Sequence, residues 1–180
     1  MHWLICKERT EIILFLFIWA NAFEERKEII FLSSNEDNWM IRDIMEIRTA
    51  TIADLAQIAA VEAECFPAAE AATKEEFEER IKYYGNHFWL MFEGEKLIAF
   101  VDGFVTDKPD LTDEMYERAE MHDENGAWQM IFGVNTIPAY RKHGYAGQLL
   151  QCAIEDARKQ GRKGLVLTWK EKLIAYYAKF

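Results

Sequence analysis

The residues with the most specific chemical pattern form one short basic segment, Arg141–Gly147. It reads Arg-Lys-His-Gly-Tyr-Ala-Gly, with cations at its start and small residues in its second half. A turn of small residues that leads into a helix leaves backbone N–H groups unpaired, and these donors together with the helix dipole favour a phosphate. Arg141 and Lys142 add positive charge. The segment is a candidate phosphate site; the alternative is an ordinary strand-to-helix turn with solvated charges, in which Gly144 only relieves crowding.

The flanking segments predict a strand before this turn and a helix after it. Trp128–Asn135 is rich in β-branched and aromatic residues, which is typical of a buried strand. Pro138 ends the strand because proline cannot donate to a ladder. Gly161 is the expected C-terminal cap of the helix. The apolar positions at helical spacing are Leu149, Leu150, Ala153, Ile154 and Ala157.

In this setting, Arg141-x-x-Gly144-x-Ala146 resembles the Arg/Gln-x-x-Gly-x-Gly/Ala signature of the GNAT N-acetyltransferases, whose turn holds the pyrophosphate of acetyl-CoA. The agreement covers roughly residues 45–180 and is greatest with the arylalkylamine N-acetyltransferase-like branch. The resemblance implies the GNAT fold, an α/β (α+β) arrangement with a mixed central sheet flanked by helices. It also implies acetyl-CoA as the co-substrate.

The resemblance further implies where the coenzyme binds. In GNAT folds the central strand diverges from its parallel neighbour and leaves backbone groups available to the pantetheine arm. Gly133 suits that role because a glycine inside a strand often marks a bulge or a close backbone approach, although a glycine in a tight packing position is the alternative. The implied coenzyme contacts are Phe132, Gly133, Val134, Arg141, Lys142, His143, Gly144, Tyr145, Ala146 and Gly147.

Acetyl transfer to an amine needs a base for the ammonium proton, a donor for the thioester oxyanion and an acid for the departing thiolate. The family places a tyrosine in the last helix near the CoA sulfur, which implies Tyr177 as the acid. A tyrosine that simply packs in the core is the alternative.

The base is where this sequence departs from its relatives. Vertebrate arylalkylamine enzymes carry two histidines at the start of the central strand, whereas residues 126–130 contain none, so serotonin-like substrates are not indicated. Cys65–Glu70 resembles the substrate loop in which insect relatives place a glutamate base. This implies Glu70 as the base, with Glu64 and His122 as the next candidates; a solvated Glu70 is the alternative. The four histidines lie apart at unrelated spacings and predict no metal site.

Composition bounds the class of protein. A chain of 180 residues is long enough for one domain with a sizeable core. Its net charge of −10 argues against a nucleic-acid partner. Acidic residues concentrate in 62–79 and 107–124, and basic residues after Pro138. A basic half suits a polyanionic coenzyme and an acidic half a cationic amine, although solvated faces of unlike sign are the alternative.

The cysteines bear on the compartment. Cys6, Cys65 and Cys152 have no metal or disulfide spacing, which favours a reducing environment and therefore a cytoplasmic location.

The other segments predict the rest of the domain. We expect strands at 46–49, 87–92, 96–105 and 164–169, the last parallel to the central strand because a helix crosses between them. Capping boxes at Thr51–Asp54 and Thr73–Glu76 predict two helix starts. A short helix is expected over Thr112–Met121 and a last helix over Lys170–Phe180.

The two ends of the sequence do not follow the family pattern. The apolar run Ile12–Ala20 is too short to span a bilayer and imitates a secretory signal, but Glu8 and Glu11 disagree with that reading. Residues 1–44 are therefore expected to be an appended or mis-started extension, or a membrane-associating or partner-binding segment. GNAT proteins usually continue beyond the segment that Tyr176–Phe180 resembles with Gly-Phe and two strands. We therefore expect a truncated domain, 45–180, with one sheet edge unpaired.

Together these patterns predict an N-acetyltransferase that moves the acetyl group of acetyl-CoA to a primary amine of a small molecule by direct attack in a ternary complex. The alternatives are a CoA-binding module with impaired catalysis, and an acetyltransferase for a peptide or protein amine. No membrane partner is expected.

Overall fold

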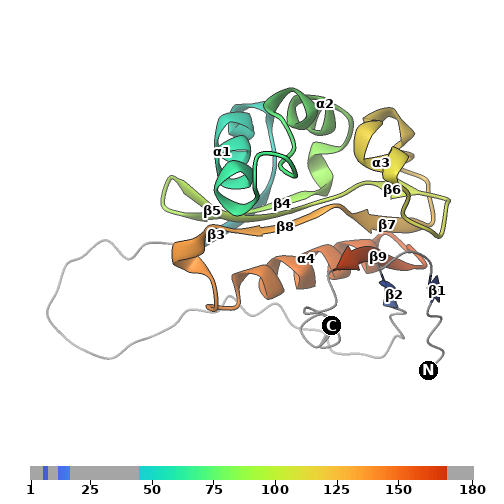
Figure 1. Cartoon of the computed structure of the whole chain (residues 1–180). Coiled ribbons are helices and arrows are strands. Elements are labelled where there is room, and N and C mark those ends of the chain that lie inside the picture. Colours follow the sequence, from blue (N-terminus) through green and yellow to red (C-terminus); the bar gives the residue numbers. More distant parts are fainter. Residues whose placement is uncertain (1–5, 8–11, 17–44, 170–180) are drawn as a thin grey trace, which may run out of the picture.

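The protein is described here by a computed structural model that covers residues 6–7, 12–16 and 45–169. Figure 1 shows α1 and α2 on one face of the strands and α4 on the other, which confirms the predicted mixed α/β arrangement. The strands are β1 (Cys6–Lys7), β2 (Ile12–Leu16), β3 (Met45–Thr49), β4 (Phe88–Glu93), β5 (Lys96–Asp102), β6 (Val105–Thr106), β7 (Trp128–Ile131), β8 (Gly133–Thr136) and β9 (Gly164–Trp169). The helices are α1 (Leu55–Cys65), α2 (Lys74–Tyr84), α3 (Asp113–Glu117) and α4 (Tyr145–Lys159).

The strands form two sheets, ordered β1-β2-β9-β7-β6 and β3-β4-β5-β8. Among the described strands, only β7 and β9 pair in parallel, as predicted, and the other pairs are antiparallel. The prediction of one continuous strand over 128–135 and another over 96–105 was wrong. Each segment forms two strands, and the two belong to different sheets. The segment β5–β6 and the segment β7–β8 each leave one sheet and enter the other, and they do so at the same level, at Gly103–Phe104 and at Phe132.

Close main-chain contact holds these two segments together where they pass between the sheets. The N–H of Phe132 donates to the carbonyl of Asp102 (2.8 Å), and the N–H of Met130 donates to the carbonyl of Phe104 (2.7 Å). A Cβ atom on Gly103 would lie 1.8 Å from the carbonyl oxygen of Met130, so this approach requires glycine. As a result, β7 stays with β9 while β8 turns away to β5. The parallel neighbours separate beyond the pair Ile131–Leu167.

The helices begin where their capping residues predicted. The carboxylate of Asp54 accepts the N–H of Thr51 (2.8 Å) before α1, and Thr73 and Glu76 form a reciprocal capping box at α2. On α4, the five residues predicted at apolar spacing are all buried. Gly161 adopts a left-handed φ of 73° and its N–H donates to Arg158, so it ends α4 as predicted. The helix expected over 112–121 is shorter, because α3 stops at Glu117 and a 3-10 turn follows.

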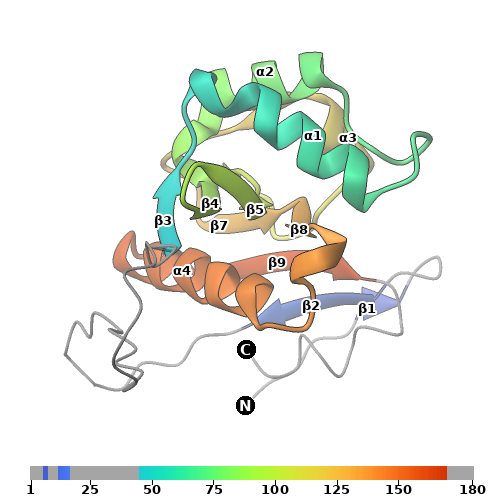
Figure 2. The ribbon, with the colours of Figure 1, turned by 90° about the vertical axis from the view of Figure 1, so that its left-hand side faces the viewer.

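One sheet edge was expected to be unpaired, and the edge of β9 away from β7 carries a strand. β2 pairs antiparallel with β9 from Ile12 opposite Trp169 to Leu16 opposite Leu165, and β1 continues the same sheet (Figure 2). The remainder of the apolar run, 17–20, and the predicted last helix lie outside the described residues. Among the described helices, none is both long enough and apolar enough to cross a bilayer.

Candidate active site

The basic turn lies between β8 and α4 and presents main-chain donors. Gly144, with φ 87°, precedes the first residue of α4, and Lys142 also has a left-handed φ of 69°. The N–H of Gln148 donates to the carbonyl of Gly144 (3.1 Å), whereas the six N–H groups of residues 142–147 donate to no acceptor within the described part of the chain. A Cβ at Gly144 would meet nothing within 4 Å. N–H groups arranged in this way at a helix N-terminus are the donors that an anion can accept.

Side chains anchor this turn to the neighbouring strands. Arg141 donates through Nε to the carbonyl of Thr136 on β8 (3.0 Å). The hydroxyl of Tyr140 donates to the carboxylate of Glu93, and Lys96 Nζ lies 5.1 Å from the centre of the Tyr140 ring. The turn is thereby tied to β8 and to the β4–β5 hairpin.

The predicted pantetheine contacts lie where the two sheets separate. Phe132, Gly133 and Val134 are half-buried at the start of β8. Among the described strands, β8 pairs with β5 alone, so its other edge faces the opening towards β9. A main-chain edge of this kind offers N–H and C=O groups to an extended ligand.

A cavity of about 420 Å³ adjoins this opening, and residues of α1 and α2 line it. Five carboxylates and one guanidinium line it, together with four aromatic rings. Of its acidic residues, only Glu70 was predicted to act in the site. The lining residues are Glu62, Phe66, Ala69, Glu70, Ala71, Ala72, Glu76, Phe77, Arg80, Asp102, Tyr116, Glu117, Phe132 and Gly133.

Glu62 is the buried carboxylate of this cavity that the sequence analysis missed as a site residue. It lies in the last turn of α1, is 7% exposed, and accepts the N–H of Ala72 through Oε1 (3.1 Å). Burial raises the pKa of Glu62, and the hydrogen bond from Ala72 opposes the rise only in part. Glu62 was counted among the acidic residues of 62–79, although it lies at helical spacing with the apolar residues of α1. The signal available was a glutamate on that apolar face.

A second buried carboxylate, Asp102, is paired with Arg80. The Nη1–Oδ2 distance is 3.2 Å, and the two residues are 7% (Arg80) and 1% (Asp102) exposed. Burial raises the pKa of Asp102 to about 6, while the Arg80 charge acts in the opposite direction. Arg80 also donates to the carbonyl of Tyr116 (2.9 Å). The cavity floor thus holds two buried carboxylates and one cation.

His87 and His122 lie apart in sequence, with no metal-ligand spacing, but the fold brings them together with Glu124. Their Nε2 atoms lie 3.0 and 3.3 Å from the same carboxylate oxygen of Glu124. Three such groups could hold a metal ion in principle. However, the N–H of Val105 donates to Nδ1 of His122 (3.2 Å), so the ring proton lies on Nε2, which then has no lone pair for a metal. Arg162 also donates to Glu124 (2.8 Å). The geometry favours a hydrogen-bonded cluster of His87, His122, Glu124 and Arg162, called the clamp below.

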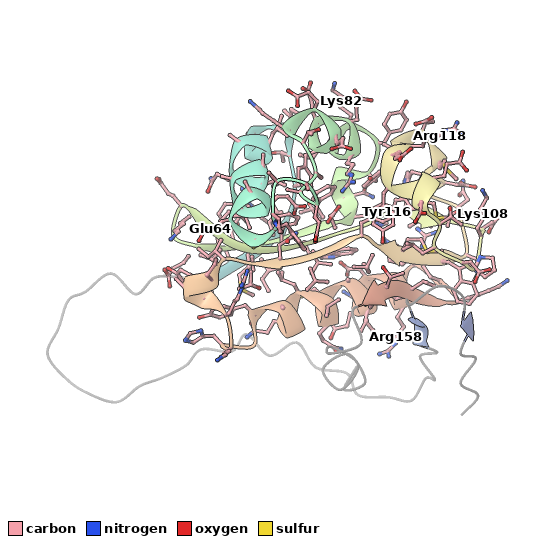
Figure 3. The ribbon with its side chains drawn as sticks, viewed as in Figure 1. Glu64, Lys82, Lys108, Tyr116, Arg118 and Arg158 are labelled. Atoms are coloured by element: carbon pink, nitrogen blue, oxygen red, sulfur yellow. The ribbon has the colours of Figure 1, made fainter. Side chains whose placement is uncertain are left out.

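The other candidates for the base are placed differently. Glu70 is exposed on the α1–α2 loop and lines the cavity at its rim. Glu64 is exposed on α1, is labelled in Figure 3, and is not among the lining residues. His122 belongs to the clamp and not to the cavity wall. Tyr177, the predicted acid, lies outside the described residues.

Comparisons with known proteins agree with this fold. The sequence model of the acetyltransferase (GNAT) family matches residues 55–180. The loading GNATL domain of CurA from Lyngbya majuscula is similar in structure, with 20% identity, a TM-score of 0.63, and coverage of 69% of this chain and 64% of that one. A GNAT-like decarboxylase, GphF in complex with isobutyryl-CoA, has 27% identity, a TM-score of 0.62, and coverage of 68% and 64%.

An acetyltransferase with its coenzyme is also similar. The GNAT family acetyltransferase from Brucella melitensis in complex with acetyl-CoA has 18% identity, a TM-score of 0.53, and coverage of 77% of this chain and 82% of that one. This chain therefore spans less than two thirds of the CurA and GphF structures and most of the Brucella one. A search of curated proteins found no match.

Proposed function

The chain belongs to the acetyltransferase (GNAT) family, and from this premise we propose that it transfers an acetyl group from acetyl-CoA to the primary amine of a small molecule. The observation that carries the proposal is one junction, Phe132–Gly133. There the opening between β8 and β9 meets a cavity that holds an excess of buried carboxylate. A thioester on one side and an ammonium on the other would be held within reach of each other.

The coenzyme half of the proposal uses the turn and the β8 edge. The pyrophosphate would accept hydrogen bonds from the N–H groups of residues 142–147, with Arg141 and Lys142 as counter-charges. The pantetheine arm would follow Phe132, Gly133 and Val134. Main-chain N–H groups of this edge would donate to the thioester oxygen as it becomes an oxyanion. We place the reaction in the cytoplasm, where acetyl-CoA is available.

The acceptor half rests on charge. Glu62 and Asp102 are buried against one cation, Arg80, so the cavity floor carries one uncompensated negative charge when both carboxyl groups are ionised. An ammonium group would neutralise it. The rings of Phe66, Phe77, Tyr116 and Phe132 would cover an apolar body attached to that group, which fits an arylalkylamine-like acceptor. A peptide or protein amine is the alternative.

We assign the base to Glu62 in preference to Glu70. The ammonium must lose its proton before its nitrogen attacks the thioester carbon. A buried carboxylate with a raised pKa takes that proton more readily than a solvated one. The nitrogen–carbon bond then forms and the carbon–sulfur bond breaks. We retain Tyr177 as the donor of a proton to the departing thiolate.

The similarity to a decarboxylase supports a second candidate function, loss of CO2 from a carboxylated acyl-CoA. The cavity argues against it. Such a substrate would bring a carboxylate among five others, and the nearest cation, Arg80, is already paired with Asp102.

The test combines calorimetry with acetyl-CoA and release of free CoA thiol on a panel of amines. We expect Glu62→Gln to lower kcat about 100-fold or more without weakening acetyl-CoA binding. Glu64→Gln, two residues along on the exposed side of α1, should behave as wild type. Tight coenzyme binding without thiol release on any amine would contradict the proposal in favour of a binding module. Release of CO2 from malonyl-CoA would favour the decarboxylase.

A further inference from the structure

Asp102 occupies the point where the coenzyme edge and the amine cavity meet. It is the last residue of β5, and its carbonyl accepts the N–H of Phe132 (2.8 Å). On the side-chain side, a Cβ atom placed on Gly133 would lie 2.5 Å from Oδ1 of Asp102. Both the main chain and the carboxylate of Asp102 therefore pack against the start of β8.

Arg80 reaches the same point from α2 and contacts the other walls of the cavity. Its Nη1 donates to Oδ2 of Asp102 (3.2 Å), and its Nη2 donates to the carbonyl of Tyr116 in α3 (2.9 Å). The guanidinium carbon lies 5.4 Å from the ring centre of Phe77 and 5.6 Å from that of Phe132. Arg80 thus supports three walls of the cavity with one buried cation.

A buried ion pair of this kind needs an explanation other than stability. Desolvation of two charges offsets much of their attraction, and apolar residues of similar size often serve stability as well. The pair also leaves Nε of Arg80 without a partner among the described residues. The charge itself matters more in a cavity that admits an ammonium ion. Without its partner, Arg80 would be a cation on the surface that the substrate must approach.

We infer that Asp102 is a positioning and specificity residue that neutralises Arg80 within the acceptor cavity and holds Gly133 in place. Arg80 braces the aromatic walls, and Asp102 makes its charge compatible with a cationic acceptor. This inference rests on the proposed function, because it assumes that the cavity receives an amine. It adds a class distinction: the enzyme selects acceptors that are protonated when they enter the cavity over those that are neutral.

The test uses two acceptors that differ in charge at neutral pH. Phenethylamine is protonated there, and aniline is neutral. We expect Asp102→Asn, which keeps the shape and removes the charge, to raise the KM for phenethylamine about tenfold. It should leave the KM for aniline and the Kd for acetyl-CoA within about twofold of wild type. A residue with a merely structural role would affect both acceptors alike.

The double variant supplies the control. Arg80→Gln combined with Asp102→Asn removes both charges, and we expect it to restore the KM for phenethylamine to within about threefold of wild type. Equal effects of Asp102→Asn on both acceptors, or no rescue in a double variant that binds acetyl-CoA normally, would overturn the inference.

Binding measurements separate this inference from the proposed function. The Kd of phenethylamine for the protein saturated with CoA can be measured by calorimetry without any turnover. If wild type binds it and Asp102→Asn does not, the inference stands even where no amine is acetylated. Failure of wild type to bind it overturns the inference, and absence of thiol release with bound amine overturns only the proposed function.

Discussion

The turn at 141–147 and the cavity beside Phe132–Gly133 are built in opposite ways. The turn is one contiguous segment whose useful groups are main-chain N–H donors that precede α4. The cavity is assembled from residues of α1, α2, α3, β5 and β8, which are up to 71 positions apart in the chain, from Glu62 to Gly133 (133 − 62). The first depends on backbone conformation, and the second on buried charge.

This difference indicates how each half tolerates change. A main-chain site accepts most side chains provided that the backbone can adopt its φ angles, so few residues in it are decisive. A site made of buried charges depends on their balance, because removal of one partner leaves the other uncompensated. The coenzyme half should therefore fail at Gly144, and the acceptor half at the Glu62, Arg80 and Asp102 group.

The largest expected effect is on the turn. Gly144→Val should weaken acetyl-CoA binding about 100-fold, because the new side chain strains a left-handed residue and enters the open space in front of the N–H donors. Gly161→Val is the matched control, since Gly161 has a similar φ of 73° and equally open surroundings at the other end of α4. Calorimetry with acetyl-CoA measures both. Equal losses in the two variants would show that backbone strain alone is responsible.

The next effect is on the cavity and depends on pH. Burial and the nearby Glu62 raise the pKa of Asp102 to about 6, against the Arg80 charge; Tyr84 and the N–H of Gly133 also face this carboxyl. Above that pH the carboxylate neutralises Arg80, and below it protonation leaves Arg80 without its paired carboxylate, so the cavity loses one negative charge. The KM for a protonated acceptor should therefore rise about tenfold as the pH falls from about 7 to about 5. Steady-state kinetics on Asp102→Asn should show a high KM without this step; the same step in the variant would assign it to another group.

A smaller effect is expected from the cations of the turn. Lys142→Gln should weaken acetyl-CoA binding about fivefold at low salt, and less at high salt, because an exposed charge is screened while the N–H donors remain. Titrations at two ionic strengths measure this. A loss as large as that of Gly144→Val would mean that charge, rather than the main chain, dominates the site.

The smallest effect separates the rim of the cavity from its floor. Glu70→Gln should raise the KM for a protonated amine about threefold and leave kcat unchanged, because an exposed carboxylate attracts the substrate only weakly. The comparison is with Glu62→Gln, for which kcat falls. Initial rates over a range of amine concentrations distinguish the two. A large loss of kcat in Glu70→Gln would return the role of the base to Glu70.

Local signals predicted most of the fold, including the turn and helix in which the coenzyme half of the site is proposed. The capping residues Thr51 and Thr73, the periodic face of α4 and Gly161 act within a few positions of themselves, so their effects are visible in sequence. The points at Gly103 and Phe132 where each strand ends and the chain enters the other sheet were missed, because each depends on contact with the other segment. Gly103 is required by the carbonyl of Met130, 27 residues later (130 − 103).

The acceptor half could not be read from sequence for the same reason. Glu62 looked like one more acid in an acidic stretch until the α1–α2 loop folded over it and Ala72 bonded to it. Arg80 and Asp102 carried no signal of their pairing, and only the fold brings His87 and His122 together, with their rings in contact and both beside Glu124. Buried charge is a property of the packed molecule.

The strand β2 has a consequence for how the molecule behaves at high concentration. Its five residues cover the outer edge of β9, which would otherwise present a row of vacant peptide groups to solvent. A shortened variant that starts at Met45 would lack this cover, and two such molecules could pair edge to edge through their β9 strands. Sedimentation of the shortened form should then depend on loading concentration, whereas the full chain should not associate through this edge.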